Sequence, residues 1–197
     1  MTNQAALPPR AGQANAPEES ARSHILVLFA TDKHGVLDRI IGLLRRRRAA
    51  VQTFSVGRSE LPNMVRVTVV TDDSEVGVEQ LVEQLRKIVD VRHIISLPRE
   101  EAVARELALI KVNSSAEQRS AIIELSHLCG AHPVDIDEET VTLEVTGNTE
   151  KIEKLVAQLQ PYGVREVART GYVAMTRGAT IEYLNAPDDT GSLSDAE

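Results

Sequence analysis

One pattern of hydrophobic periodicity occurs twice in this chain of 197 residues, and this repeat most constrains the fold. Residues 23–98 contain four apolar or alternating segments that predict strands and two segments of helical periodicity that predict helices. The predicted order is βαββαβ, and residues 104–178 repeat it. We therefore expect an α+β protein of two consecutive ferredoxin-like domains, each a four-stranded sheet with two helices on one face.

The first predicted unit begins with His24–Ala30, a continuously apolar run that is typical of a strand buried on both faces. The next segment has apolar residues at i, i+3, i+4 and i+7, the spacing of an amphipathic helix. The other predicted strands are 51–56, 65–69 and 89–97. A second helix is predicted to be capped by residues 72–74 and to bury Val78, Leu81, Val82 and Leu85.

The second unit has the same elements at similar spacing. The predicted strands are 107–112, 132–136, 141–145 and 164–175, the last interrupted at Gly171. One predicted helix carries Ile122, Leu125 and Cys129 and is capped by Ser114 and Ser115, and the other carries Ile152, Leu155, Val156 and Leu159 and is capped by Thr149. Each sheet would leave one face without helices, so we expect a partner to cover that face or an edge.

Both ends of the chain differ from its middle in composition. Residues 1–22 and 179–197 lack apolar periodicity, which predicts two disordered tails, and residues 99–103 are expected to form a linker. Of the net charge of −7, the C-terminal tail carries −5, so the body at 23–178 is nearly neutral. A neutral body argues against extensive nucleic-acid binding. The single cysteine, Cys129, excludes an intrachain disulfide, and the lack of a signal peptide or membrane-spanning run predicts a cytoplasmic protein.

The polar loop Thr31–Gly35 joins the first strand to the first helix. The first turn of a helix has backbone N–H groups without intrahelical acceptors, so such a corner can bind a small anionic group. Asp32 can be read either as the N-cap of this helix or as a contact to a ligand. Gly35 is expected at a position that needs unusual backbone freedom or close approach.

Four stretches resemble one known family. They are Gly35–Leu43, Lys87–Val91, Arg105–Val112 and Arg165–Gly171. The first unit resembles an ACT domain, a small amino-acid-sensing module, and residues 23–178 resemble the regulatory small subunit of acetolactate synthase (acetohydroxyacid synthase). The last two stretches are the more discriminating because they match the second domain of that subunit.

This resemblance implies a regulatory subunit without catalytic residues or bound metal. It implies a homodimer through the ACT domains that binds the catalytic large subunit, activates it and confers feedback control by a branched-chain amino acid, usually valine, held at the junction of two ACT domains. Thiamine diphosphate, magnesium and FAD would belong to the large subunit, and none to this chain. The implied effector-binding residues are Asp32, Lys33, His34, Gly35, Val36, Leu37, Ala50 and Val51.

The chain departs from the family pattern within this implied site. Asp32 and Ala50 stand where the family has asparagines, and only Gly35 is retained. An ionised aspartate accepts hydrogen bonds but cannot donate to an effector carboxylate, and alanine can do neither. Arg48 and Ala49 also replace a glycine and an aromatic residue after the first helix. We therefore expect weakened valine binding or a different effector.

Other interpretations of these residues are less favoured. Arg45–Arg48 could form a phosphate or nucleic-acid patch, but we interpret the run as a solvated helix end because stacking aromatics are scarce. His127, Cys129, His132 and Asp135 are metal-ligand types whose spacing matches no common zinc motif. The main alternative function is a free-standing ACT-type amino-acid sensor or interaction module without a synthase partner. RNA binding on a sheet face would require exposed aromatic pairs that the sequence lacks.

Overall fold

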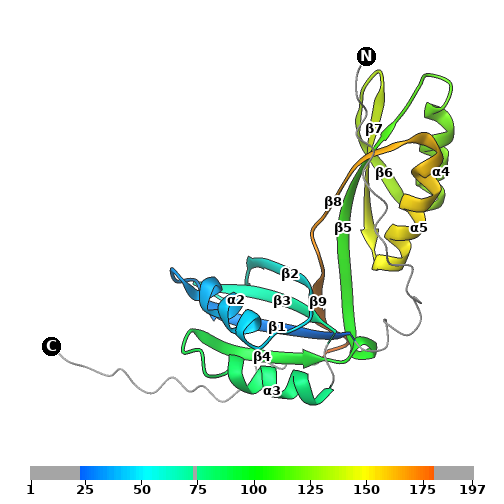
Figure 1. The fold of residues 1–197 in the computed structure, drawn as a ribbon. Coiled ribbons are helices and arrows are strands. Elements are labelled where there is room, and N and C mark those ends of the chain that lie inside the picture. The colour runs from blue at the N-terminus through cyan, green and yellow to red at the C-terminus, as the bar shows by residue number, and fades with distance from the viewer. Residues whose placement is uncertain (1–22, 73–74, 180–197) are drawn as a thin grey trace.

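The structure of the chain is a computed structural model that describes residues 23–72 and 75–179 (Figure 1). The first unit contains β1 (His24–Thr31), α2 (Val36–Arg46), β2 (Val51–Arg58), β3 (Met64–Thr71), α3 (Glu75–Leu85) and β4 (Val91–Leu97). After a short 3-10 helix, η1 (Arg99–Glu101), the second unit contains β5 (Ala102–Asn113), α4 (Arg119–Leu128), β6 (Ala131–Ile136), β7 (Thr140–Gly147), α5 (Thr149–Leu159), the 3-10 helix η2 (Gln160–Tyr162), β8 (Val164–Arg169) and β9 (Val173–Thr176). The predicted βαββαβ order is confirmed in both units.

The two sheets have the same antiparallel topology. The strand order is β2-β3-β1-β4 in the first sheet and β6-β7-β5-β8 in the second. The first strand of each unit is therefore central, as the ferredoxin-like plan requires. In each unit both helices lie on one side of the sheet, and β5 runs from the first unit into the second (Figure 1).

The central strand β1 confirms the expectation of burial on both faces. Residues 25–30 are all buried. Leu26, Leu28 and Ala30 belong to the core beneath α2 and α3, which also contains Ile40, Leu44, Leu81 and Leu85. The alternate residues Ile25, Val27 and Phe29 belong to a separate cluster on the opposite face. A strand with apolar side chains on both faces is stable only where both faces are covered.

The cover of that opposite face comes from the same chain. Residues 102–105 of β5 pair with β9 in a two-stranded ribbon, in which Ala104 faces Ala174. Ala102, Tyr172 and Ala174 are buried against the first sheet together with Val70, Ile95 and Leu97. The expectation that a partner covers the face opposite the helices is therefore wrong for the first sheet, because β5 begins five residues earlier than predicted and β9 accompanies it.

The same ribbon explains the burial of β3. The alternation of Val65, Val67 and Val69 with polar residues predicts a half-buried strand, but Thr68 and Val70, which point to the opposite face, are also buried. The last predicted strand is confirmed with its interruption at Gly171. Its two parts, β8 and β9, both pair with β5, the former in the second sheet and the latter in the ribbon.

The N-caps agree only partly with prediction. Asn148, not Thr149, is the N-cap of α5, and its side chain accepts a hydrogen bond from the Lys151 amide at 3.0 Å. Ser115 Oγ accepts from the Gln118 amide at 3.3 Å, in a turn just before α4. The predicted caps at 73 and 74 and the tail segments 1–22 and 180–197 lie outside the described residues. Within the described part of the chain, no helix is long and apolar enough to cross a membrane.

Candidate effector site

The loop between β1 and α2 is held by two segments that are distant in sequence. The Thr31 amide donates to the Asp90 carbonyl at 2.8 Å, and Thr31 Oγ1 donates to the Asp90 carboxylate at 3.1 Å. The Asp32 amide donates to the carbonyl of Asn63, which has a φ of +58° in the β2–β3 turn. Asp90 also forms an ion pair with Arg39 of α2. The sequence does not predict these contacts, because the β1–α2 loop, the β2–β3 turn and the segment before β4 are far apart along the chain.

Gly35 is the N-cap of α2 and has a φ of +80°. A Cβ atom at this position would meet no heavy atom within 4 Å, so the position demands glycine for its backbone conformation and not for lack of space. Asp32 lies three residues earlier, and α2 has no side-chain cap. The interpretation of Asp32 as the helix N-cap is therefore wrong.

The predicted set of unpaired amides is present at this corner. The Val36 amide donates to the Lys33 carbonyl at 3.2 Å, and the Arg39 amide donates to Gly35. Within the described part of the chain, the amides of His34, Gly35, Leu37 and Asp38 donate to no acceptor. Asp32, Lys33, His34 and Gly35 are exposed, whereas Val36 is buried and Leu37 is half-buried in the core. The corner can therefore accept a small anionic group from solvent.

Ala50 and Val51 lie at the other end of the same sheet. In the β1–β3 pairing Thr31 is opposite Met64, while in the β2–β3 pairing Val51 is opposite Thr71. Seven residues of β3 separate these ends, which corresponds to about 23 Å. A single chain therefore does not bring the two groups of candidate effector-binding residues together. Val51 is 39% exposed at the start of the edge strand β2.

The connection between α2 and β2 has the backbone conformation that the resemblance implied for glycine. Arg48 has a φ of +55°, and its amide donates to the Arg45 carbonyl at 3.0 Å. A non-glycine residue in this region is strained by about 1 kcal/mol. Ala49 packs at the margin of the first core.

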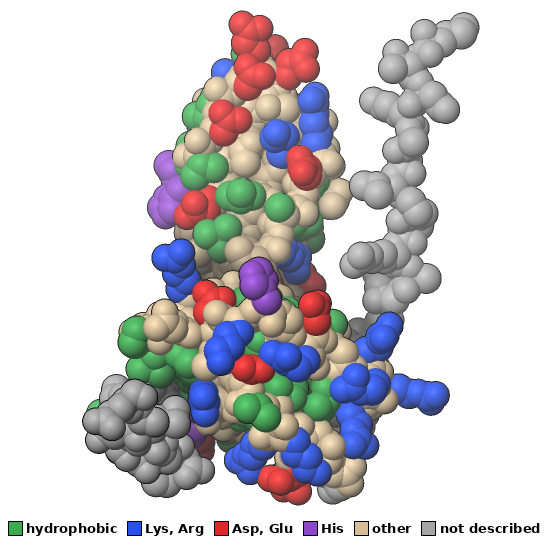
Figure 2. All heavy atoms as spheres, turned by 90° about the vertical axis from the view of Figure 1, so that its left-hand side faces the viewer, with side chains coloured by type: hydrophobic (Ala, Val, Ile, Leu, Met, Phe, Trp, Pro, Cys, Tyr) green, Lys and Arg blue, Asp and Glu red, His purple; other side chains and the backbone are tan. Residues whose placement is uncertain are grey.

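The four arginines at 45–48 are exposed. None of the four forms an ion pair with another described residue. Residues 23–98 hold eleven Lys and Arg against nine Asp and Glu, so the first unit is only slightly basic. Figure 2 shows that Lys and Arg side chains predominate over the first unit on this face, whereas acidic ones gather at the far tip of the second.

The candidate metal ligands do not form a cluster. The ring centroids of His127 and His132 lie 6.5 Å apart, and Cys129 Sγ lies 3.2 Å from Gln158 Oε1. Among residues 23–72 and 75–179, no three His, Cys, Asp or Glu side chains are placed to hold a metal ion. Cys129 is half-buried, packs against the second core as predicted and follows the last residue of α4.

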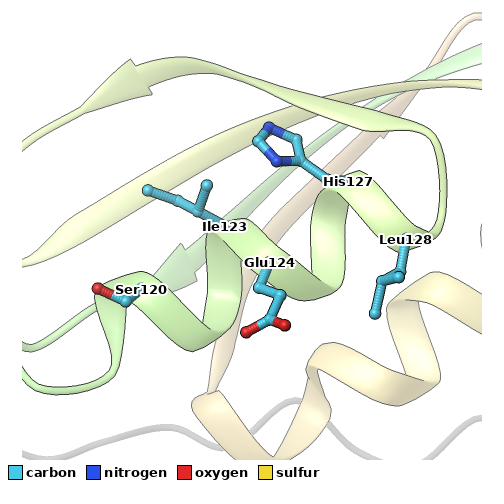
Figure 3. Close-up of a pocket in the computed structure, with 5 residues that line it drawn as sticks. All are labelled: Ser120, Ile123, Glu124, His127 and Leu128. Atoms are coloured by element: carbon cyan, nitrogen blue, oxygen red, sulfur yellow. The ribbon is translucent and has the colours of Figure 1, made fainter.

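A surface depression lies on α4, far from the β1–α2 loop in sequence. Its lining residues are Ser120, Ile123, Glu124, His127 and Leu128. Figure 3 shows that all of them project from this one helix, with His127 and Ile123 on the side of the strands and Glu124 and Leu128 on the side of α5. All of its lining residues belong to a single helix, and they do not form a cluster of charged side chains.

The described aromatic residues are placed in cores. Phe29 and Tyr172 are buried against the ribbon side of the first sheet, and Phe54 and Tyr162 pack at the margins of the two helix-covered cores. None of these rings forms an exposed stacking pair on a sheet face, which is the arrangement that single-stranded RNA uses on ferredoxin-like sheets.

Comparison with known proteins identifies both units. Residues 26–93 match the family model described as "AHAS small subunit-like ACT domain", and residues 105–178 match the model described as "Small subunit of acetolactate synthase". The acetolactate synthase small subunit of Mycobacterium bovis is 39% identical over 159 residues, which cover 81% of this chain and 95% of that protein. The small subunit from Mycolicibacterium smegmatis is 41% identical over 156 residues, which cover 79% of this chain and 92% of that protein.

A solved structure has the same arrangement of both units. The crystal structure of the acetolactate synthase small subunit from Thermotoga maritima aligns with a TM-score of 0.76 and 31% sequence identity. The alignment covers 81% of this chain and 99% of that one. The similarity therefore extends over the first sheet, the ribbon and the second sheet together.

Proposed function

Because the chain belongs to the family of acetolactate synthase small subunits, we propose that it binds the catalytic large subunit, raises its activity and couples that activity to a branched-chain amino acid. The family is that of a regulatory subunit, and the observation that carries the proposal is the match over both units in one chain. Thiamine diphosphate, magnesium and FAD would be bound by the large subunit.

The effector site of this proposal is formed by two copies of the chain. In one copy, the loop residues lie about 23 Å from Ala50 and Val51. Each end of the sheet therefore carries only one of these two groups of site residues. A twofold axis across two abutting edges places opposite strand ends side by side. The outer edge of β2 pairs with no described strand, and Val51 and Val56 on it are 39% and 43% exposed. This edge is suited to pairing with a second copy.

The amino-acid chemistry at this site differs from that of the family pattern. The free amides at His34 and Gly35 would bind the effector carboxylate, and the Asp32 carboxylate would accept from its ammonium group. The side chain of Ala50 has no polar group to contact the effector, and a hydrogen bond to a charged group contributes about 1.5–3 kcal/mol. Loss of this hydrogen bond should weaken valine binding by about tenfold to a hundredfold, compared with a site that has both asparagines.

Co-expression with an acetolactate synthase large subunit tests the proposal. The chain should co-purify with the large subunit and increase the rate of acetolactate formation from pyruvate. Calorimetric titration with valine, leucine and isoleucine then measures effector affinity on the same preparation. Amino-acid binding without association with a large subunit would support the alternative, a free-standing ACT-type sensor, and contradict the proposed function.

A further inference from the structure

The segment Arg169–Tyr172 lies where the two units meet, and its first contacts are to the second unit. Thr170 Oγ1 accepts a hydrogen bond from the Leu107 amide at 3.1 Å, and the Thr170 amide donates to the Leu107 carbonyl at 3.1 Å. Arg169 lies 4.0 Å from the carboxylate of Glu106, which is only 4% exposed. The segment is thus bonded to residues 106 and 107 of β5, which lie between the part of that strand that pairs with β9 and the part that pairs with β8.

The same segment touches the edge strand β2 of the first unit. Ser55 Oγ donates to the Thr170 carbonyl at 3.0 Å. Gly171 follows with a φ of +76°, and a Cβ there would lie 2.8 Å from Ser55 Oγ and 3.2 Å from Thr53 Cβ. The turn therefore packs directly on β2, the strand that begins with Val51 of the candidate effector site.

Tyr172 connects this turn to helix α5 in the second unit. Its side chain is 7% exposed and belongs to the cluster on the ribbon side of the first sheet. Its hydroxyl accepts a hydrogen bond from the Thr149 amide at 2.9 Å and lies 2.7 Å from Thr149 Oγ1. Thr149 is the first residue of α5, and its amide is one of those that have no acceptor within the helix. The Tyr172 hydroxyl supplies that acceptor.

We propose that Tyr172 is a positioning residue that couples β2 of the ACT unit to the N-terminus of α5 in the second unit. A shift of β2 moves Ser55, the Thr170–Gly171 turn bonded to it and the Tyr172 ring that follows, and the hydroxyl carries the shift to Thr149. The regulatory meaning of this path rests on the proposed function, but the mechanical coupling does not. The path gives a physical reason why an event at the ACT edge would reach the second unit.

Hydrogen exchange of the full chain tests the coupling without an effector. Tyr172→Phe removes only the hydroxyl and should accelerate exchange at the Thr149 amide about fivefold, the value of one neutral hydrogen bond. Tyr162→Phe is the matched control, because the Tyr162 ring packs at the second core and its hydroxyl has no partner among the described residues. This control should leave exchange at Thr149 unchanged.

A double substitution separates coupling from simple stability. Ser55→Ala cuts the bond between β2 and the turn, and it should accelerate exchange at Thr149 in the wild-type background but have no further effect in the Tyr172→Phe background. A purely structural role would give additive effects. Additive effects, no effect of Ser55→Ala, or an equal effect of Tyr162→Phe would each overturn the proposal.

The proposed function has a separate readout. If the wild-type chain fails to stimulate a large subunit while the exchange effects are coupled, the proposed function is refuted and the positioning role of Tyr172 stands. If the chain instead stimulates a large subunit and the exchange effects are additive, the proposed function stands and the positioning role of Tyr172 is refuted.

Discussion

Gly171→Ala tests the packing of the interunit turn on β2. Gly171 has a φ of +76°, and alanine in this region is strained by about 1 kcal/mol. The new Cβ would also lie 3.2 Å from Thr53 Cβ, which is attached to the β2 backbone and cannot rotate away. Ser55 Oγ, at 2.8 Å, would have to leave the Thr170 carbonyl. Overpacking of this kind costs about 1–3 kcal/mol, so the total should be about 2–4 kcal/mol.

Gly35→Ala is the matched control for backbone strain. Gly35 has a φ of +80°, but a Cβ there would meet no heavy atom within 4 Å. Its substitution should therefore cost only the conformational part, about 1 kcal/mol. The difference between the two variants isolates the contact between the turn and β2.

Thermal unfolding followed by circular dichroism measures this difference. For a folded region of this size, each kcal/mol lowers Tm by about 2–4 °C. Gly35→Ala should lower Tm by about 3 °C, and Gly171→Ala by two to four times as much, following the ratio of the two free energies. Equal destabilisation by the two substitutions would show that the turn does not pack on β2 and would refute the reasoning.

Three further outcomes are expected. Arg48→Gly relieves a φ of +55° and should stabilise the chain by about 0.5–1 kcal/mol in urea unfolding; a loss of stability would contradict the assigned strain. Asn148→Ala removes the α5 cap and should cost about 1 kcal/mol, whereas an unchanged urea midpoint would argue against that cap. Asp32→Asn combined with Ala50→Asn should strengthen valine binding at least tenfold in calorimetry, and unchanged affinity would separate these positions from the effector.

The sequence predicted those features that depend on local periodicity. The apolar run of β1, the helical spacing at Val78 to Leu85 and the interruption at Gly171 all correspond to observed features. Their order was sufficient to predict the antiparallel ferredoxin-like plan because connections in such units are short.

The ribbon of β5 and β9 was missed because strand partners are not encoded locally. Ala102, Ala104 and Ala174 alternate with larger residues, and this alternation lets two strands lie close on the first sheet. The signal is weak in a single sequence because alanine is also common in helices. The cap of α5 differs from prediction for another reason: Asn148 and Thr149 are both favoured capping types, and the sequence pattern does not locate the first helical residue to within one position.

The candidate effector site was only partly accessible from the sequence. Gly35 and the free amides of the corner follow from a strand, a polar loop and a helix in succession. The loop is held by hydrogen bonds that Thr31 and Asp32 donate to Asp90 and Asn63, and these acceptors lie in connections that meet the loop only in the folded sheet. The separation of Asp32 from Ala50 likewise depends on the pairing of β1 and β2 with β3.

The rate of acetolactate formation by a purified large subunit, measured as this chain is added in increasing amounts, tests the central claim most directly. We expect the rate to rise and saturate at a fixed ratio of the two chains. If the rate of an acetolactate synthase large subunit stays unchanged at every ratio of the two chains, the account is contradicted.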